Sequence, residues 1–285
     1  MIRLANKRYA AIVVKDSSGR VLVNTAGQFR VVFSFHAGID GRPNEGSIRI
    51  YGLTTGEEQE IKINGDSVQL IAGSDVRNNL VFSGDLISAF SAEVNQQSYV
   101  QLSVVDGDSF FSSFVSLSVG AGESVGGVVE KAVRNCTAPI EIGFIAPSAY
   151  NVSLARGVAL FGCPIDVIRS AAKSLNATSY VRNGMFYLIC AEDKLADPVL
   201  LGEDELIGVP VVDNWYSMFK AEMDSGLSVG QFVSFSSEYG LGTYRVVSID
   251  GSGDTRDGDW CLNVTSIAQN NSRPAITAVT SNIWR

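Results

Sequence analysis

The sequence is poor in histidine and in positive charge. It contains a single histidine, His36, and 22 Lys and Arg against 30 Asp and Glu, which gives a formal net charge of −8 over 285 residues. One histidine excludes metal sites built from several histidines. An acidic chain is also unsuited to holding nucleic-acid phosphates by counterion release. These two shortages remove several classes of metalloenzyme and of nucleic-acid-binding protein.

Closely spaced cysteines and long apolar runs are also missing. No two of the four cysteines form a C-x-x-C pair, and they are far apart in the chain: Cys136, Cys163, Cys190 and Cys261. We interpret them as reduced thiols rather than zinc ligands or a redox pair. The apolar stretch from Tyr9 to Val14 stops at Lys15, which is too short for a signal-peptide core or a membrane span. We therefore expect no cofactor and no insertion into a membrane.

Short strand patterns dominate the first part of the chain. In residues 29–36 every second side chain is large and apolar: Phe29, Val31, Phe33 and Phe35. This alternation predicts a half-buried strand, and His36 falls on its more polar face, where a surface or interface role is favoured over catalysis. Further strands are predicted over residues 47–51, 67–72, 80–83 and 99–105. Short strands at this spacing indicate a barrel or a sandwich.

The middle of the chain changes to a helical period. Apolar residues recur at helical spacing from Val125 to Val133, which predicts an amphipathic helix. A second helix is expected to begin at Pro164 and to end near Asn176. Asn183-Gly184 between two apolar runs then predicts a tight β-hairpin. This region reads as a small α+β domain between two β segments.

The last third repeats a pattern of the first. Residues 65–70 and 230–235 share the pattern G-x-x-V-x-(L/F), and two further apolar strands follow each copy. Three similar strands in the same order predict two versions of one barrel. We therefore expect a mainly β fold with an α+β insertion. Its parts are two related tube-like β-barrels over 1–106 and 196–269, the α+β domain over 107–195, and a C-terminal tail over 270–285.

One motif resembles an esterase nucleophile. Residues 122–126 spell G-x-S-x-G, but this motif needs a strand before the serine and a histidine after it. Here the preceding segment is rich in glycine, and the histidine lies upstream. Ser124 is therefore expected to start or cap a helix. No catalytic residue is assigned, and we expect a protein that is not an enzyme.

Four aspartates fall within residues 250–259. Their spacing is not that of an EF-hand and no glutamate closes the loop, so we expect a solvated hairpin tip. Asp254, Asp257 and Asp259 remain weak candidates for a metal site.

Several strings in the two β segments occur in an order that resembles a known family. "SIRIYGLT" at 47–54 is similar to an I-x-I-Y-N-L strand, and "GDSVQLIAG" at 65–73 to G-D-x-V-x-L-x-A-G. "VFSGDL" at 81–86 is similar to (I/L)-F-x-G-x-I, and the last part adds similar strings between 206 and 260. Together they resemble the baseplate hub proteins of contractile-tailed bacteriophages, which are related to the hub half of type VI secretion spikes.

The resemblance implies a structural phage tail protein. Three chains would surround an axis, so that six barrels join the sixfold tail tube to the threefold central spike and form part of the DNA channel. The partners would be the tube protein, the spike and other baseplate proteins, in a virion whose proteins are made in the host cytoplasm. Genome DNA would pass without specific binding, and we expect a lumen of net negative charge because like charges repel phosphates.

The C-terminal tail carries two large apolar residues close to its end. Ile283 and Trp284 are large apolar residues at an otherwise polar end, and we expect them to contact the spike or a neighbouring subunit.

The alternative to a structural hub is a carbohydrate-binding or hydrolytic tail-tip protein, which needs clustered exposed aromatics or a paired-carboxylate cleft. The three tryptophans are widely spaced: Trp215, Trp260 and Trp284.

Overall fold

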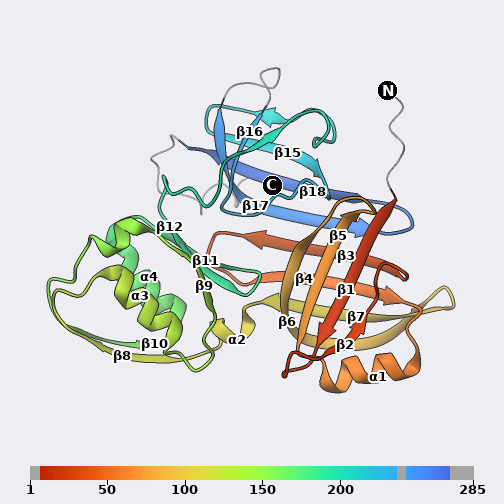
Figure 1. The fold of residues 1–285 in the computed structure, drawn as a ribbon, viewed down its shortest axis with the longest axis horizontal. Coiled ribbons are helices and arrows are strands. Elements are labelled where there is room, and N and C mark those ends of the chain that lie inside the picture. Colours follow the sequence, from red (N-terminus) through yellow and green to blue (C-terminus); the bar gives the residue numbers. More distant parts are fainter. Residues whose placement is uncertain (1–6, 236–241, 270–285) are drawn as a thin grey trace.

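The computed structural model describes residues 7–235 and 242–269 of the chain. The first β segment consists of strands and one helix (Figure 1): β1 (Arg8–Lys15), β2 (Val21–Asn24), β3 (Arg30–Gly38), β4 (Asn44–Tyr51), α1 (Thr55–Asn64), β5 (Ser67–Ser74), β6 (Asn78–Val94) and β7 (Gln97–Asp106). The third segment returns to strands: β13 (Val199–Leu201), β14 (Val211–Val212), β15 (Tyr216–Glu222), β16 (Phe232–Phe235), β17 (Thr243–Asp254) and β18 (Trp260–Ala268).

The middle segment is the α+β region that the sequence predicts. Its elements are α2 (Asp108–Phe111), β8 (Val115–Val119), α3 (Val125–Arg134), β9 (Glu141–Ile145), the 3-10 helix η1 (Pro147–Tyr150), β10 (Val158–Gly162), α4 (Pro164–Ala172), the 3-10 helix η2 (Lys173–Leu175), β11 (Thr178–Arg182) and β12 (Met185–Ile189). Figure 1 shows α3 and α4 together on one side of the molecule, away from the large sheet.

The two β segments belong to one sheet. Within the described residues, 13 strands pair, with the main order β14-β15-β18-β17-β3-β4-β7-β6-β5-β1-β2. The junction is the antiparallel pair β3–β17, which runs from Gly38 opposite Ser248 to Val32 opposite Asp254. The repeated pattern is visible in the topology, because β5-β6-β7 and β16-β17-β18 are both antiparallel runs of consecutive strands.

The mainly β class with an α+β insertion is confirmed, but the expected closed barrels are not. A strand has two edges, and β3 uses them for β4 and β17. Closing the first segment into a barrel would require β3 to pair with β2, the strand at the end of the order. In the described part of the chain, β2 pairs only with β1. The free pairing edge therefore goes to the other β segment, and the two segments form a continuous curved sheet.

One hydrophobic core runs under both β segments. It joins buried side chains of the first segment, such as Val31 and Leu70, to those of the third, such as Phe219 and Val246. At the junction, two glycines of β17 lie directly against phenylalanine rings of β3. A Cβ atom at Gly251 would collide with the ring of Phe35, and the same holds for Gly253 and Phe33. Glycine is therefore required for the close approach of β17 to these rings.

The hairpin β11–β12 lies between this core and a second one. Tyr180 and Tyr187 belong to the core under the large sheet, whereas Val181 and Phe186 belong to a core built around α3 and α4. The predicted turn is present, with positive φ angles of 51° at Asn183 and 75° at Gly184. The two faces of one hairpin thus connect the middle segment to the large sheet.

Candidate functional site

A row of serines crosses the outer face of the sheet where the two β segments meet. On β17, β3, β4, β7 and β6 the residues directly opposite one another are Ser252, Ser34, Ser47, Ser103 and Ser88. Directly opposed residues share one face of a sheet, so five hydroxyl side chains lie side by side across five strands. This small, uncharged row spans the junction of the two segments without interruption.

A second row on the same face, two residues further along the strands, carries charge. It contains Asn263, Asp250, His36, Glu45, Val105 and Asp85 in the order of the strands. Nδ1 of His36 lies 2.7 Å from Oδ1 of Asp250, and both side chains are exposed. This hydrogen bond, helped by the charges of Asp250, Asp40 and Glu45, raises the pKa of His36. His36 is therefore a surface residue of a polar face, as its position in the alternating pattern predicts.

Apart from their β6 residues, Ser88 and Asp85, the two rows line a broad shallow hollow of about 520 Å³. Beyond the serine row, at the end of the strands away from the charged row, two arginines stack on tyrosines. The guanidinium of Arg30 lies 4.9 Å from the ring centre of Tyr51, and that of Arg49 lies 5.5 Å from the ring centre of Tyr99. We call the serine row, the charged row and these stacked pairs the polar face. Along the strands it changes from acidic, through hydroxyl, to arginine and tyrosine.

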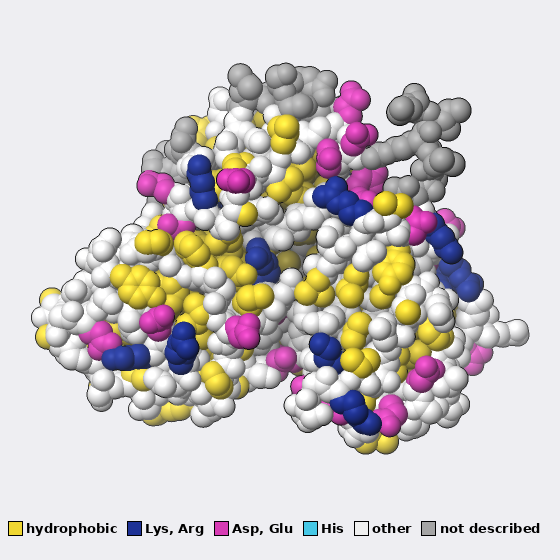
Figure 2. Space-filling model, in the orientation of Figure 1, with side chains coloured by type: hydrophobic (Ala, Val, Ile, Leu, Met, Phe, Trp, Pro, Cys, Tyr) yellow, Lys and Arg dark blue, Asp and Glu magenta, His cyan; other side chains and the backbone are white. Residues whose placement is uncertain are grey.

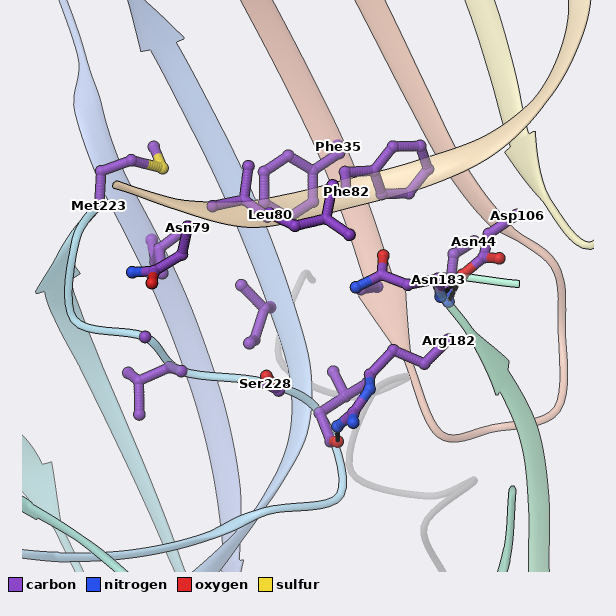
Figure 3. Close-up of a pocket in the computed structure, with 17 residues that line it drawn as sticks. Phe35, Asn44, Asn79, Leu80, Phe82, Asp106, Arg182, Asn183, Met223 and Ser228 are labelled. Atoms are coloured by element: carbon purple, nitrogen blue, oxygen red, sulfur yellow. Dashed lines mark hydrogen bonds between the residues drawn. The ribbon is translucent and has the colours of Figure 1, made fainter. Parts of the chain in front are cut away.

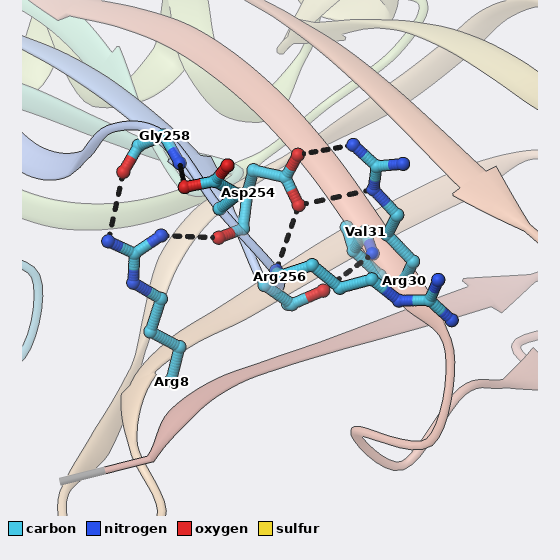
Figure 4. A network of polar contacts seen from close by, with 8 residues as sticks. Arg8, Arg30, Val31, Asp254, Arg256 and Gly258 are labelled. Carbon is cyan, nitrogen blue, oxygen red and sulfur yellow. Dashed lines mark hydrogen bonds and ion pairs between the residues drawn. The ribbon is translucent and has the colours of Figure 1, made fainter.

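The aspartates that were weak metal candidates take part in a different network (Figure 4). Oδ2 of Asp254 accepts a hydrogen bond of 2.7 Å from Arg30, and Oδ1 accepts one of 2.9 Å from the backbone N–H of Arg256. Arg8 donates to the backbone carbonyls of Asp254 and Gly258. Although partial burial opposes it, the ion pair with Arg30 lowers the pKa of Asp254. The carboxylate closes the turn between β17 and β18 onto β3.

This network corrects one detail of the sequence interpretation. The expected hairpin tip over 250–259 begins later, because Asp250 to Asp254 are still strand residues paired with β3. Oδ1 of Asp257 accepts the backbone N–H of Gly258 within the turn. The described residues, which include Asp259, contain no group of three or more His, Cys, Asp or Glu side chains that could hold a metal ion.

A cleft of about 180 Å³ opens where the three segments meet (Figure 3). Apolar side chains, among them Phe35, Leu80 and Met223, form one wall, and the turn of the β11–β12 hairpin forms another. Figure 2 shows apolar side chains gathered on the visible surface where α3 and α4 approach the β segments, with charged side chains scattered around them. The cleft itself combines the apolar wall with polar side chains, among them Asn44, Asn79 and Arg182.

The carboxyl of Asp106 holds the hairpin turn at the edge of this cleft. It accepts the backbone N–H groups of Asn183 at 2.6 Å and Gly184 at 2.8 Å, and the side-chain amide of Asn44 at 3.4 Å. Burial raises the pKa of Asp106 to about 6 despite these three donors. Asp106 is a single carboxyl that already accepts three hydrogen bonds, so it differs from the pair of carboxylates that a glycosidase uses.

Ser124 has the capping role predicted for it. Its hydroxyl accepts the backbone N–H of Gly127 at 3.1 Å at the start of α3, and its backbone has the ordinary extended conformation of an N-cap, with φ −72° and ψ 147°. Ile283 and Trp284 lie outside the described residues. None of the helices in the described ranges has the length and apolar character that crossing a membrane requires.

The serine row is the part of the site that sequence reasoning missed. Each serine lies between two buried apolar residues of its own strand in β3 and β7, as Ser34 does between Phe33 and Phe35. That signal was visible in the alternation of single strands. The pairing of β17 with β3, which adds Ser252 to the row, has no local signature.

Comparison with known proteins identifies the fold. No protein-family model and no curated protein matches the sequence. Among solved structures, the chain is similar to the 43 kDa tail protein of prophage MuSo2 from Shewanella oneidensis, with a TM-score of 0.60, 8% identity and coverage of 91% of this chain and 98% of that chain. A tail protein from Neisseria meningitidis MC58 is similar with a TM-score of 0.60, 11% identity and coverage of 91% and 96%.

A third similar structure extends the likeness to secretion systems. The E. coli c3393 protein is described as a component of the type VI secretion system with structural similarity to the T4 bacteriophage tail proteins gp27 and gp5. It matches with a TM-score of 0.57, 9% identity and coverage of 84% of this chain and 73% of that chain. At sequence identities of 8 to 11%, the structural similarity establishes a shared fold. The chain therefore has a fold that phage tail proteins and a type VI secretion component share, which confirms the expected resemblance at the level of structure.

Proposed function

We propose that the protein is a structural component of a bacteriophage tail, the baseplate hub. Three copies form a ring around the tail axis, join the sixfold tail tube to the threefold spike, and enclose part of the DNA channel. The fold shared with phage tail proteins over 91% of the chain supports the tail assignment. The finer assignment, to a hub that lines a channel, rests on the polar face.

The observation that carries this proposal is the unbroken serine row. A surface past which DNA moves must be hydrated, yet must not hold phosphates. Short hydroxyl side chains meet both needs, because they bind water and carry neither charge nor long flexible arms. The row crosses the β3–β17 junction, so both β segments contribute to one continuous wall. We infer that this wall faces the channel.

The charged row supports the same orientation. Glu45, Asp250 and Asp85 place carboxylates beside the serines, and like charge repels the phosphate backbone of DNA. The proposed channel thus has an acidic zone next to a neutral hydroxyl zone. The arginines at the far end of the face are stacked on tyrosines, and Arg30 is also neutralised by Asp254.

The proposed role is not enzymatic. A sugar site is expected to offer exposed aromatic rings at a cleft. The described part of the chain does have exposed aromatic side chains, but none of them lines the cleft: Phe90, Phe114, Tyr150, Phe161 and Trp215. Trp260 packs edge-on against Phe33 at 5.5 Å. The one carboxyl that lines the cleft in the described residues, Asp106, is buried and accepts hydrogen bonds from three donors.

Besides the other copies of this chain, the proposed partners are the tube protein, the spike and further baseplate proteins of the virion.

Electron cryo-microscopy of phage tails that carry this chain with a small C-terminal tag tests the proposal. We expect three copies on the tail axis between tube and spike, with Ser34 and Ser47 lining the bore. A position away from the axis, or a bore lined mainly by Lys and Arg, would contradict it. Double substitution of Ser34 and Ser47 by Arg is expected to leave tail assembly intact and to slow DNA release, because cations in the bore bind phosphates.

A further inference from the structure

The cleft where the three segments meet contains a guanidinium whose hydrogen-bonding capacity is only partly used. Arg182, the last residue of β11, is half-buried and lines the cleft. Its Nη1 donates to the carbonyl of Val229 at 2.9 Å, and its Nη2 donates to the hydroxyl of Tyr187 at 2.9 Å. A guanidinium has five N–H donors, so three are left for other partners. In the described part of the chain Arg182 forms no ion pair, either with Asp106 or with any other carboxylate. A half-buried cation in this position favours an anion beside it.

A side-chain amide points into the same cleft. Asn183 follows Arg182 in the β11–β12 turn, and Figure 3 shows its side chain directed into the cleft. Within the described residues this amide forms no hydrogen bond, because the bond recorded for Asn183 comes from its backbone N–H. The amide of Asn44 and the carboxyl of Asp106 line the cleft too, but both are already bound to groups of the protein. The donors open to a ligand are therefore those of Arg182 and Asn183.

The apolar wall of the cleft reaches the surface. Leu80 of β6 is exposed to 42%, and Leu227, in the loop between β15 and β16, is half-buried. Phe35 and Met223 extend this wall into the core. Figure 3 shows Leu80, Phe35 and Met223 on one side of the cleft and Arg182 on the other. Apolar surface thus lies beside a guanidinium and an amide within about 180 Å³. Small-ligand sites commonly combine an apolar lining with a few convergent polar groups.

We propose that this cleft binds an apolar group that carries one carboxylate, supplied by a free aliphatic acid or by the C-terminal end of a peptide whose last side chain is apolar. The carboxylate accepts hydrogen bonds from Arg182 and Asn183, and the apolar group lies against Leu80 and Leu227. A planar guanidinium fits a carboxylate through two parallel N–H···O bonds. A single negative charge is favoured over a dianion, because Asp106 lines the same cleft and one guanidinium balances one charge. This inference does not depend on the proposed hub role.

Titration of the purified full-length chain with aliphatic acids tests the proposal. Butanoate, hexanoate and octanoate differ only in chain length, and we expect the affinity to rise by about fourfold for each CH₂ group until the cleft is filled. Hexanamide has the same apolar chain without the charge and is expected to bind about tenfold more weakly than hexanoate. Isothermal titration calorimetry measures the affinities, and NMR follows the side-chain amide of Asn183. Equal affinities for hexanoate and hexanamide would contradict the proposal.

Substitutions on two walls locate the site. Arg182→Gln is expected to weaken hexanoate binding by about tenfold, because the ion pair is lost. Leu80→Asp places a second carboxylate beside the ligand and is expected to abolish binding; since Leu80 is exposed to 42%, this variant stays informative if Arg182→Gln unfolds. Leu200→Asp is the matched control, because Leu200 is exposed to 66% and does not line the cleft. Its affinity for hexanoate should equal that of the wild type, and circular dichroism checks the fold of each variant.

Short peptides separate the two sources of the carboxylate. An acetylated tripeptide that ends in leucine with a free carboxylate is compared with the same peptide ending in an amide, and with hexanoate. Tighter binding of the acid peptide than of hexanoate identifies a chain end as the ligand, and the reverse order identifies a free acid. No binding of any acid at about 10 mM, or unchanged binding in both Arg182→Gln and Leu80→Asp, would overturn the proposal and leave the proposed function in place.

Discussion

Single buried polar residues hold the three segments of this protein together. Arg245 of β17 is buried, stacks on Phe232 at 4.2 Å, and donates to four backbone carbonyls, three of which belong to residues 190–193 that follow β12. Asp106 does the reverse, since a carboxyl of the first segment accepts backbone N–H groups of the β11–β12 turn. Burying an ionisable group is tolerable when hydrogen bonds satisfy it, and both contacts cross segment boundaries.

The raised pKa of Asp106 makes stability depend on pH in an unusual direction for a carboxyl. Its pKa rises from an ordinary 3.8 to about 6, so the folded protein binds this proton more tightly than the unfolded chain does. Stability from this group is therefore present at low pH and is lost as pH rises through about 6. The raised pKa of His36 acts in the same direction. Asp254 and Glu57, whose pKa values are lowered, titrate below this window.

We expect the free energy of unfolding in urea to increase by about 1 kcal/mol from pH 7 to pH 5 because of Asp106. In Asp106→Asn this part of the pH dependence is expected to disappear, whatever the absolute stability of the variant. His36→Gln is the comparison variant and should keep it. Equal pH dependence in the wild type and in Asp106→Asn would show that the carboxyl does not bind its proton as the structure implies.

At the scale of elements, turn and cap residues define where helices and strands begin and end. Thr54 and Glu57 form a capping box at the start of α1, and Ser124 caps α3. Asn176, with a φ of 50°, ends the helical stretch after α4. The β11–β12 turn needs two positive φ angles, and Asn183 supplies the first. These local choices agree with the tertiary structure, so the elements form where their own sequences favour them.

Asn183→Ala is expected to lower the free energy of unfolding by about 1 kcal/mol, because alanine pays for the left-handed conformation that asparagine tolerates. Asn183→Gly is the matched control and should be nearly neutral. Both variants keep the backbone N–H that donates to Asp106. Chemical denaturation of the two variants side by side measures the difference. Equal losses in both would point to the asparagine side chain itself rather than to backbone conformation.

At the scale of the whole molecule, the shared sheet and core join the first and third segments into one structure. The β3–β17 pair is antiparallel over seven residue pairs, from Gly38 to Val32 on β3. The core beneath it contains residues of both segments, whereas α3 and α4 enclose a separate core. The first and third segments should therefore unfold together, and the helical part can follow its own equilibrium.

Gly251→Ala tests this coupling by placing a Cβ against the ring of Phe35. We expect a loss of about 2 kcal/mol and faster amide hydrogen exchange in β3, β4, β17 and β18 together, with little change in α3. Gly120→Ala is the control, because a Cβ there meets open space. Faster exchange confined to β17 and β18 would show that the two segments are independent.

Much of the local structure could be predicted from the sequence. The alternation in β3, the apolar stripe of α3, the proline start of α4 and the Asn-Gly turn each act within a few residues, and each element formed as predicted. The polar position of His36 followed from the same alternation. Helix and strand periods place side chains on faces, and that relation holds whatever the rest of the chain does.

The choice of partner strands came only from the tertiary structure. Every strand edge offers the same backbone N–H and C=O groups, so no local pattern tells β3 to pair with β17 rather than close a barrel with β2. That one pairing added Ser252 to the four aligned serines of the first segment, brought His36 to Asp250 and Arg30 to Asp254, and merged two expected barrels into one sheet. The sequence alone determined which side chains face out. The register between distant strands decided which of them meet, because backbone hydrogen bonding does not distinguish one strand from another.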